Sequence, residues 1–404
     1  TPLYSSAASD VYKRQMEDWR NAGFGLYVHW PFCQSKCPYC DFNSHVAAQV
    51  DQSRWLLAFE AEIDRIGTLT EQRVLNSVFF GGGTPSLMEA ATVQGILDRV
   101  RATWSLANDV EITLEANPGS VEASRFEGYA AAGVNRVSLG IQSLDPDDLR
   151  RLGRMHSVDE ARAAIGVAQS VFDRVSIDLI YARQDQGLAA WRDELRRALD
   201  FGTSHLSLYQ LTVEDGTVFG QMHAKNLLRG LPDEDLSADM FELTQEITAA
   251  AGLPAYEVSN HARPGDESRH NLIYWRMGDY AGVGPGAHGR LTIGAGRVAT
   301  EAERMPAVWL DRTLSAPGGA ERVESLSDAD RANEYLIFAL RLREGASLDR
   351  FADLARTPLA DGALKEVIEL GLLEREGDRI RTTDRGVMML NGVLRRLLAD
   401  RGSA

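Results

Sequence analysis

The sequence is poor in lysine and lacks long apolar segments. The second of these absences bears on the class of protein. Only four of its 43 basic residues are lysines, which we attribute to coding preference rather than to mechanism. No apolar run approaches the roughly 20 residues that a membrane-spanning helix needs, and the first residues lack the apolar core of a secretory signal. The formal net charge of −15 disfavours binding to a nucleic-acid backbone.

Cysteine is also scarce, and the few cysteines present are close together. All three, Cys33, Cys37 and Cys40, lie within eight consecutive residues. An odd and clustered set is a poor framework for disulfides and a good metal-binding loop. We therefore expect the protein to work in a reducing compartment, the cytoplasm.

The middle of the chain alternates short β-branched or aromatic runs with segments of helical period. Residues 1–15 lack such a pattern and are expected to be a non-native or disordered tail before Met16. The predicted strands are Phe24–His29, Val74–Phe80, Val110–Glu115, Arg136–Ile141, Arg174–Tyr181 and His205–Leu211. The predicted helices between them are Ser53–Ile66, Thr92–Trp104, Val121–Ala132, Val158–Val171 and Leu188–Leu199. This alternation predicts an α/β domain of parallel units over residues 16–290, either a partial (β/α)6 barrel or a doubly wound sheet.

A second, smaller unit is expected at the C-terminal end. Pro306, Pro317 and the Gly318-Gly319 pair indicate a linker region over residues 291–326. Helical patterns and one hairpin pattern then fill residues 327–404, the outline of a winged-helix-like α+β domain. No helix there forms a basic stripe, so we expect a docking or lid domain and no nucleic-acid partner.

The three cysteines follow the segment from Tyr27 to Phe32 with the spacing Cys-x3-Cys-x2-Cys. A [4Fe–4S] cluster has four irons, and three thiolates from one short loop leave one iron open. That iron can bind the amino and carboxylate groups of S-adenosylmethionine (SAM). The alternative is a structural zinc site with His29 or His45 as its fourth ligand, although zinc sites usually pair their ligands in two separated knuckles.

This spacing, with Tyr39 before the last cysteine, resembles the radical SAM superfamily. The wider sequence resembles the branch that contains oxygen-independent coproporphyrinogen III oxidases and related haem chaperones, from about residue 24 to the C-terminal end. The resemblance implies a [4Fe–4S] cluster held by the three cysteines and a SAM site at the ends of the strands. The SAM-binding residues that it implies are Tyr27, Gly82, Gly83, Thr84, Glu115, Gln142, Arg154 and Asp178.

Two absences separate this sequence from the oxidases. Their fourth cysteine position holds Phe42 here, and little chain lies between Met16 and Cys33 for the N-terminal extension that the oxidases carry. We therefore leave open whether the protein is an enzyme. The favoured interpretation is a haem chaperone, and the alternative is a radical enzyme that decarboxylates coproporphyrinogen III to protoporphyrinogen IX.

The run His270-Asn-Leu-Ile-Tyr274-Trp275 resembles a haem-binding signature of the chaperones. An imidazole can ligate iron and aromatic rings can cover a macrocycle, so His270 is the candidate haem ligand. The same residues also make an ordinary packed core. The resemblance further implies a haem-accepting partner protein, transient contact with membrane-associated haem proteins, and a possible homodimer.

Overall fold

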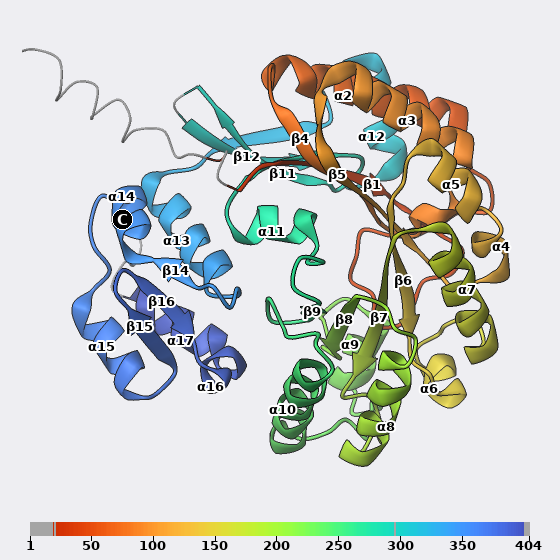
Figure 1. Ribbon diagram of the computed structural model, residues 1–404. Coiled ribbons are helices and arrows are strands. Elements are labelled where there is room, and N and C mark those ends of the chain that lie inside the picture. The colour runs from red at the N-terminus through yellow and green to blue at the C-terminus, as the bar shows by residue number, and fades with distance from the viewer. Residues whose placement is uncertain (1–18, 20–21, 295, 400–404) are drawn as a thin grey trace, which may run out of the picture.

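The computed structural model describes residue 19 and residues 22–294 and 296–399, so the expected tail at 1–15 lies outside the described residues. Its main feature is a large curved sheet that carries helices on its outer face (Figure 1). Among the described residues the strand order of this sheet is β13-β12-β11-β10-β1-β4-β5-β6-β7-β8-β9.

The central strands run parallel and follow one another in sequence order. They are β1 (Phe24–Trp30), β4 (Val74–Gly82), β5 (Ser105–Ala116), β6 (Arg136–Gln142), β7 (Arg174–Tyr181) and β8 (His205–Gln210). The six predicted strands are therefore confirmed. A doubly wound sheet would reverse its strand order at a switch point, whereas this order is that of a partial barrel.

The helices between the strands follow the predicted periods. They are α2 (Gln52–Leu69), α3 (Ala90–Thr103), α4 (Ser120–Ala123), α5 (Phe126–Ala132), α6 (Pro146–Arg151), α7 (Val158–Val171) and α8 (Leu188–Leu199). The single helix predicted over Val121–Ala132 is divided into α4 and α5. Trp55, Phe59 and Ile63 of α2 are buried against the sheet, which explains why their helical spacing could be recognised.

Strand β1 shows how the sequence assigns side chains to the two faces. Phe24, Leu26 and Val28 are fully buried in the main core, while Tyr27 and His29 alternate with them and contact each other. Since successive side chains of a strand point to opposite faces, one face packs on helices and the other lines the barrel interior. The ends of the parallel strands then meet at one edge of the sheet.

The predicted linker at 291–326 differs from the structure. Strands β11 (His288–Ile293), β12 (Gly296–Ala302) and β13 (Glu321–Ser325) continue the main sheet beyond β10 (Asp279–Val283). Helix α12 (Pro306–Ser315) packs on α2, with the Trp309 and Trp55 rings stacked 5.4 Å apart. Pro306 was expected to end regular structure, but it is the first residue of α12. Proline is favoured in the first turn of a helix because the N–H group that it lacks would have no helical partner there.

Four further segments complete the barrel domain. They are α9 (Val218–Ala224), α10 (Glu234–Ala250), β9 (Asn260–Ala262) and α11 (Arg269–Trp275). Two of them, α10 and α11, contact the C-terminal domain. Two short strands, β2 (Phe32–Cys33) and β3 (His45–Val46), pair with each other around the cysteine loop, and the short 3-10 helix η2 (Pro85–Leu87) follows β4.

The C-terminal domain has its own apolar core of helices around a three-stranded sheet. Its elements are α13 (Asp328–Ala339), β14 (Ala346–Ser347), α14 (Leu348–Ala355), α15 (Asp361–Glu369), β15 (Leu373–Glu376), β16 (Arg379–Thr382), α16 (Asp384–Met388) and α17 (Leu390–Leu398). Met277 of the barrel domain belongs to this core as well. Among the described residues, no helix has both the length and the apolar character to cross a membrane.

Candidate functional site

A cavity of about 980 Å³ opens at the carboxyl ends of the parallel strands. Its wall includes the three cysteines and every predicted SAM residue except Tyr27: Cys33, Cys37, Cys40, Gly82, Gly83, Thr84, Glu115, Gln142, Arg154 and Asp178. These residues come from six separate segments of the chain. The volume is near the upper end of the roughly 300–1,000 Å³ that is usual for small-molecule sites, so the cavity has room for more than one small group.

The cysteine loop is fixed to the end of β4 through backbone hydrogen bonds. Thr84 N donates to Phe32 O at 2.9 Å, and Gly83 N donates to Trp30 O at 2.7 Å. A Cβ atom on Gly83 would lie 2.7 Å from Phe32 O, so only glycine permits this approach. The Thr84 hydroxyl also donates to Cys33 Sγ at 3.4 Å. The glycines thus hold the first cysteine against the cavity wall.

The histidines of the zinc alternative already have other partners. His29 Nε2 lies 3.0 Å from Asn43 O, and its Nδ1 lies 3.1 Å from the Tyr27 hydroxyl. His45 Nε2 lies 3.2 Å from Asn43 Oδ1. Both ring nitrogens of His29 are in hydrogen bonds, so this histidine is not free to bind a metal in this conformation. The three thiols form no disulfide, and soft thiolates suit an iron–sulfur cluster.

Arg154 joins the cysteine loop to the ends of two strands. Its guanidinium donates to Asn117 Oδ1 at 2.5 Å, to Gly140 O at 2.8 Å and to Cys37 Sγ at 3.5 Å. Its Nε atom is buried and has no hydrogen-bond partner among the described residues. A buried cation with an unused donor is suited to a carboxylate ligand.

Gln142 lies beside Arg154 at an irregular point of the sheet. It has φ +67°, in the left-handed region, where the register of β6 and β7 shifts. Its Oε1 atom is buried and has no hydrogen-bond partner among the described residues. Strained backbone and an unused buried acceptor are typical of binding sites, and an amino group would satisfy this acceptor. The residues present therefore fit an amino-acid ligand such as the methionine part of SAM.

Two carboxyl groups line the cavity: Glu115 near the end of β5 and Asp178 within β7, three residues before the strand ends. Burial, and then the nearby Asp178 carboxylate, raise the pKa of Glu115 to about 8. Burial also raises the pKa of Asp178, which accepts a hydrogen bond from the Ser138 hydroxyl at 3.0 Å. A cationic ligand between them would favour both ionised forms.

We expect SAM affinity to rise with pH because Glu115 has to ionise before it attracts the SAM cation. Below the pKa of about 8 most of the carboxyl is protonated, and SAM binding should release a proton. Affinity should rise by up to about tenfold per pH unit between pH 6 and 8 and then level off. Calorimetry of SAM binding in buffers of different ionisation enthalpy measures this proton release.

The control for this prediction is Glu115→Gln, which removes the titrating group but keeps its shape. The variant should bind SAM with a flatter pH profile and release fewer protons. The charges that face Glu115 are Asp178 and Arg136, and the Gly82 N–H also donates to it, so these groups must stay unchanged in the comparison. The same profile in both proteins would contradict the assignment.

Tyr27 is the one predicted SAM residue that does not line the cavity. Its ring stacks on Phe79 at 6.2 Å, and its hydroxyl contacts His29 Nδ1. Burial raises its pKa above the usual range. A Cβ on Gly81 would come within 2.8 Å of the Tyr27 ring, so Tyr27 supports the glycine segment from behind.

That His270 ligates haem iron stays a prediction, and the structure shows where its side chain lies in this conformation. His270 is buried at the start of α11 and is not part of the cavity wall. Its Nδ1 lies 2.8 Å from the Ser77 hydroxyl, and its Nε2 lies 2.5 Å from the Tyr274 hydroxyl. Burial lowers its pKa to about 3. Both ring nitrogens are in use, so His270 offers no free lone pair to iron in this conformation.

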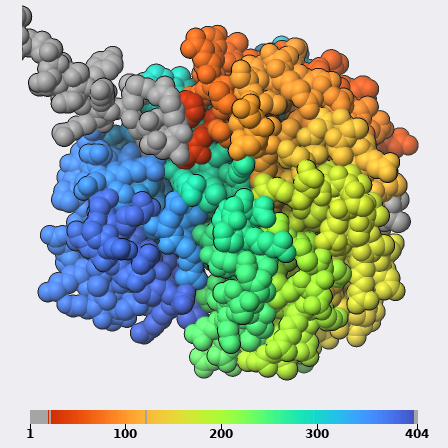
Figure 2. All heavy atoms as spheres, viewed as in Figure 1, coloured from red at the N-terminus to blue at the C-terminus, as the bar shows by residue number. Residues whose placement is uncertain are grey.

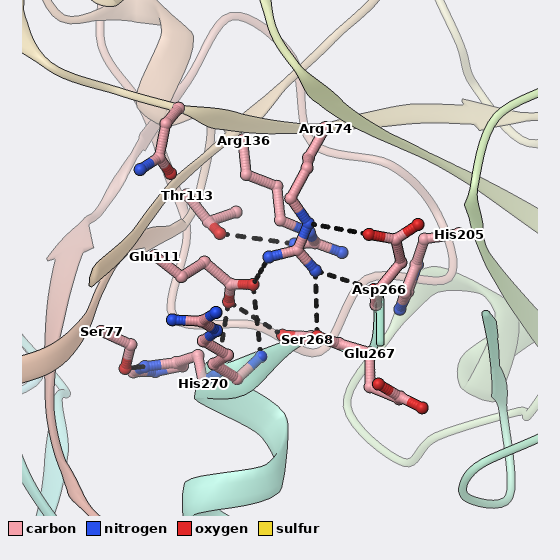
Figure 3. A network of polar contacts seen from close by, with 12 residues as sticks. Ser77, Glu111, Thr113, Arg136, Arg174, His205, Asp266, Glu267, Ser268 and His270 are labelled. Carbon is pink, nitrogen blue, oxygen red and sulfur yellow. Dashed lines mark hydrogen bonds and ion pairs between the residues drawn. The ribbon is translucent and has the colours of Figure 1, made fainter. Parts of the chain in front are cut away.

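His270 belongs to a buried polar network that holds the first turn of α11 (Figure 3). Glu111 accepts from Arg174 Nη1 at 2.6 Å and from the backbone N–H groups of Arg269 and His270, both at 3.2 Å. A carboxylate at a helix N-terminus satisfies otherwise unpaired N–H groups. His270 therefore helps to attach the start of α11 to strands β4 and β5 of the barrel.

Sequence reasoning missed the part of the cavity wall that the C-terminal domain provides. Arg341, Val387, Met388 and Asn391 all line the same cavity as the cysteines. No local motif marks them, because their position depends on how two domains pack. The expectation of a docking or lid domain was the only signal available.

Comparisons with known proteins agree with this site. The radical SAM superfamily profile matches residues 27–189, and the HemN C-terminal domain profile matches residues 326–389. The fold is similar to the solved structure of coproporphyrinogen III oxidase (HemN) from Escherichia coli, with a TM-score of 0.78, 22% identity and coverage of 93% of this chain and 90% of that one. Fold and cysteine loop thus define a radical SAM protein with a HemN-type C-terminal domain.

Relatives that match over nearly the whole chain identify the family within this class. The chain is 39% identical over 382 residues to the heme chaperone HemW of Escherichia coli, covering 93% of this chain and 98% of the relative. It is also 39% identical over 385 residues to the mitochondrial radical S-adenosyl methionine domain-containing protein 1 of Bos taurus, covering 93% of this chain and 87% of that protein. The chain belongs to the HemW family of radical SAM proteins.

Proposed function

We propose that this protein is a haem chaperone, which binds haem and transfers it to an acceptor protein. The observation that carries the proposal is the sequence identity of 37–39% to the heme chaperones HemW. This similarity covers 93% of the chain, so it includes both domains and not only the cluster loop. The shared cavity supports it, because one space is lined by both domains. A site between domains can open and close around a cargo molecule as the domains move.

We further propose which residues hold the resident cofactors. Cys33, Cys37 and Cys40 would hold a [4Fe–4S] cluster, which would supply an iron site open to the amino and carboxylate groups of SAM. Gln142 and Arg154 would receive the amino and carboxylate groups of SAM, as their unused buried atoms suggest. Glu115 and Asp178 would attract the SAM cation and its ribose hydroxyls. Gly82, Gly83 and Thr84 would let the ligand approach the end of β4.

A haem titration of the anaerobically reconstituted protein tests the proposal. We expect saturable binding of one haem per chain, seen as a new absorption band with a sharp equivalence point. The cluster should stay intact during the titration, since the cavity extends beyond the cysteine loop and leaves space for a second group. Haem uptake that rises linearly without saturation, as for nonspecific adsorption, would refute a chaperone site.

The alternative is an oxidase like HemN, whose fold the chain shares. The oxidases' fourth cysteine position holds Phe42, a side chain that lies at the cavity and is 59% exposed. We expect that incubation with SAM, a reductant and coproporphyrinogen III yields no protoporphyrinogen IX. Catalytic product formation by protein with an intact cluster would establish the oxidase function and displace the chaperone proposal.

Three finer expectations complete the proposal. The three thiols have to stay reduced until the cluster binds, which favours the cytoplasm as the place of action. Delivery of haem requires an acceptor haem protein, which we expect to be membrane-associated and to be contacted transiently. We also retain a homodimer as the proposed assembly, and sedimentation of the reconstituted protein measures it.

A further inference from the structure

The far end of the cavity differs in character from the cysteine end. It is formed where α10 of the barrel lies against α16 of the C-terminal domain, the green and blue parts that meet in Figure 2. Its apolar side chains are Phe241, Val258, Val387 and Met388. Met388 is 37% exposed. Polar side chains line the cavity here as well, among them Ser237, Asn391 and the acids Asp233 and Glu234, so the apolar wall offered to a flat molecule is one part of a mixed surface.

Arg341 supplies the positive charge at this end. Among the described residues that line the cavity, the other basic side chains, Lys36 and Arg154, lie at the cysteine loop. The Arg341 side chain is 30% exposed, while its Nε atom is buried without a hydrogen-bond partner among the described residues. Its ion pair with Glu257 Oε2 is long, at 3.5 Å. A guanidinium has five N–H donors, so most of its capacity remains free for an anionic ligand.

The aromatic motif of α11 fixes this arginine in place. The Arg341 guanidinium lies 4.5 Å from the centre of the Trp275 ring, and Trp275 packs edge-on against Phe338 at 5.7 Å. The next residue, Arg276, forms hydrogen bonds of 3.0 and 2.8 Å to Glu344. Helix α11 is thus anchored in the barrel at His270 and holds the C-terminal domain at its other end.

We propose that Arg341 binds a propionate carboxylate of haem, and that Trp275 of the His-Asn-x-x-Tyr-Trp motif positions this arginine. The macrocycle would lie on the apolar wall, and one propionate would reach the guanidinium. Haem carries two carboxylates, and the chain as a whole has a net charge of −15, so a local cation is required to hold such an anion. The inference rests on the proposed haem function and names its binding residue.

The test compares haem with its dimethyl ester, which has the same macrocycle and iron but no free carboxylate. Equilibrium titrations use full-length protein with its cluster reconstituted. We expect the wild type to bind haem about tenfold or more tightly than the ester, as a lost charged hydrogen bond implies. Arg341→Gln should lose this preference by binding haem more weakly while its affinity for the ester stays the same.

Arg343→Gln is the matched control, because Arg343 lies two residues away and pairs with Asp384 and Gln245 instead of lining the cavity. It should keep the wild-type preference for haem. Trp275→Leu should reduce the preference for haem over the ester. If the affinities for haem and for the ester changed by the same factor, the Trp275 ring would only stabilise the fold and would not position Arg341. Cluster absorbance reports on folding in every variant.

Two results would overturn the inference. One is equal affinity of the wild type for haem and ester, which needs no variant. The other is an Arg341→Gln protein that keeps the wild-type preference or weakens both ligands equally. Absence of haem binding by the wild type would instead refute the proposed function itself, so the two failures can be told apart.

Discussion

The Cys37→Ser variant is expected to lose its iron and sulfide and the broad visible absorption of the cluster. A serine hydroxyl is a poor ligand at neutral pH, and two remaining thiolates, Cys33 and Cys40, hold a cubane too weakly to survive gel filtration. SAM binding should fall with the cluster, because the open iron is part of the SAM site. Iron and sulfide analysis after anaerobic reconstitution measures the effect.

Ser35→Ala is the matched control for this variant. Ser35 lies in the same loop and lines the same cavity but has no thiol. The control should keep a full complement of iron and an unchanged spectrum. If Cys37→Ser kept the same iron content as the control, the loop would not hold the cluster.

Arg154→Gln should weaken SAM binding by about a hundredfold while the cluster remains. Loss of a charge-assisted hydrogen bond to the SAM carboxylate accounts for about one to two powers of ten. The substitution also leaves Asn117 Oδ1 and Gly140 O without their donor, which adds to the cost. Calorimetric titration of SAM into the reconstituted protein gives the affinity.

The control here is Arg151→Gln, three residues earlier in the chain. Arg151 contacts Gln184 O and Asp185 outside the SAM residues, so its loss should leave SAM affinity within about twofold of wild type. Arg154→Lys keeps the positive charge but not the planar guanidinium, so its SAM affinity should lie between those of Arg151→Gln and Arg154→Gln. An Arg154→Gln protein with full iron and wild-type SAM affinity would remove this residue from the site.

The sequence was sufficient to predict the barrel because its strands and helices depend on local patterns, whereas the SAM residues were implied by the resemblance to a family and stay a prediction. Alternating residues such as Phe24, Leu26 and Val28 identify a strand, and polar residues such as Glu115 and Asp178 lie in the carboxyl-terminal halves of their strands. Parallel strands bring their carboxyl ends to one edge, so the residues meet without any further information.

The errors came from features that local patterns do not contain. Pro306 and Gly318-Gly319 suggested a linker, but whether such residues separate domains or join a helix to strands of the same sheet depends on long-range pairing. The surroundings of His270 could not be predicted either, because its partners Ser77 and Glu111 come from β4 and β5, more than a hundred residues earlier in the chain. Arg341 was missed because its role depends on the contact with Trp275 across the domain boundary.

The central claim, that this protein hands haem over rather than merely storing it, is tested most directly by the kinetics of transfer. Protein loaded with one haem is mixed with increasing amounts of an apo-form b-type cytochrome, and in parallel with apomyoglobin as a passive scavenger. A chaperone transfers haem through a complex, so the rate to the cytochrome should rise with its concentration and exceed the rate of release to the scavenger. Equal rates for both proteins, independent of their concentration, would show spontaneous dissociation and contradict the account.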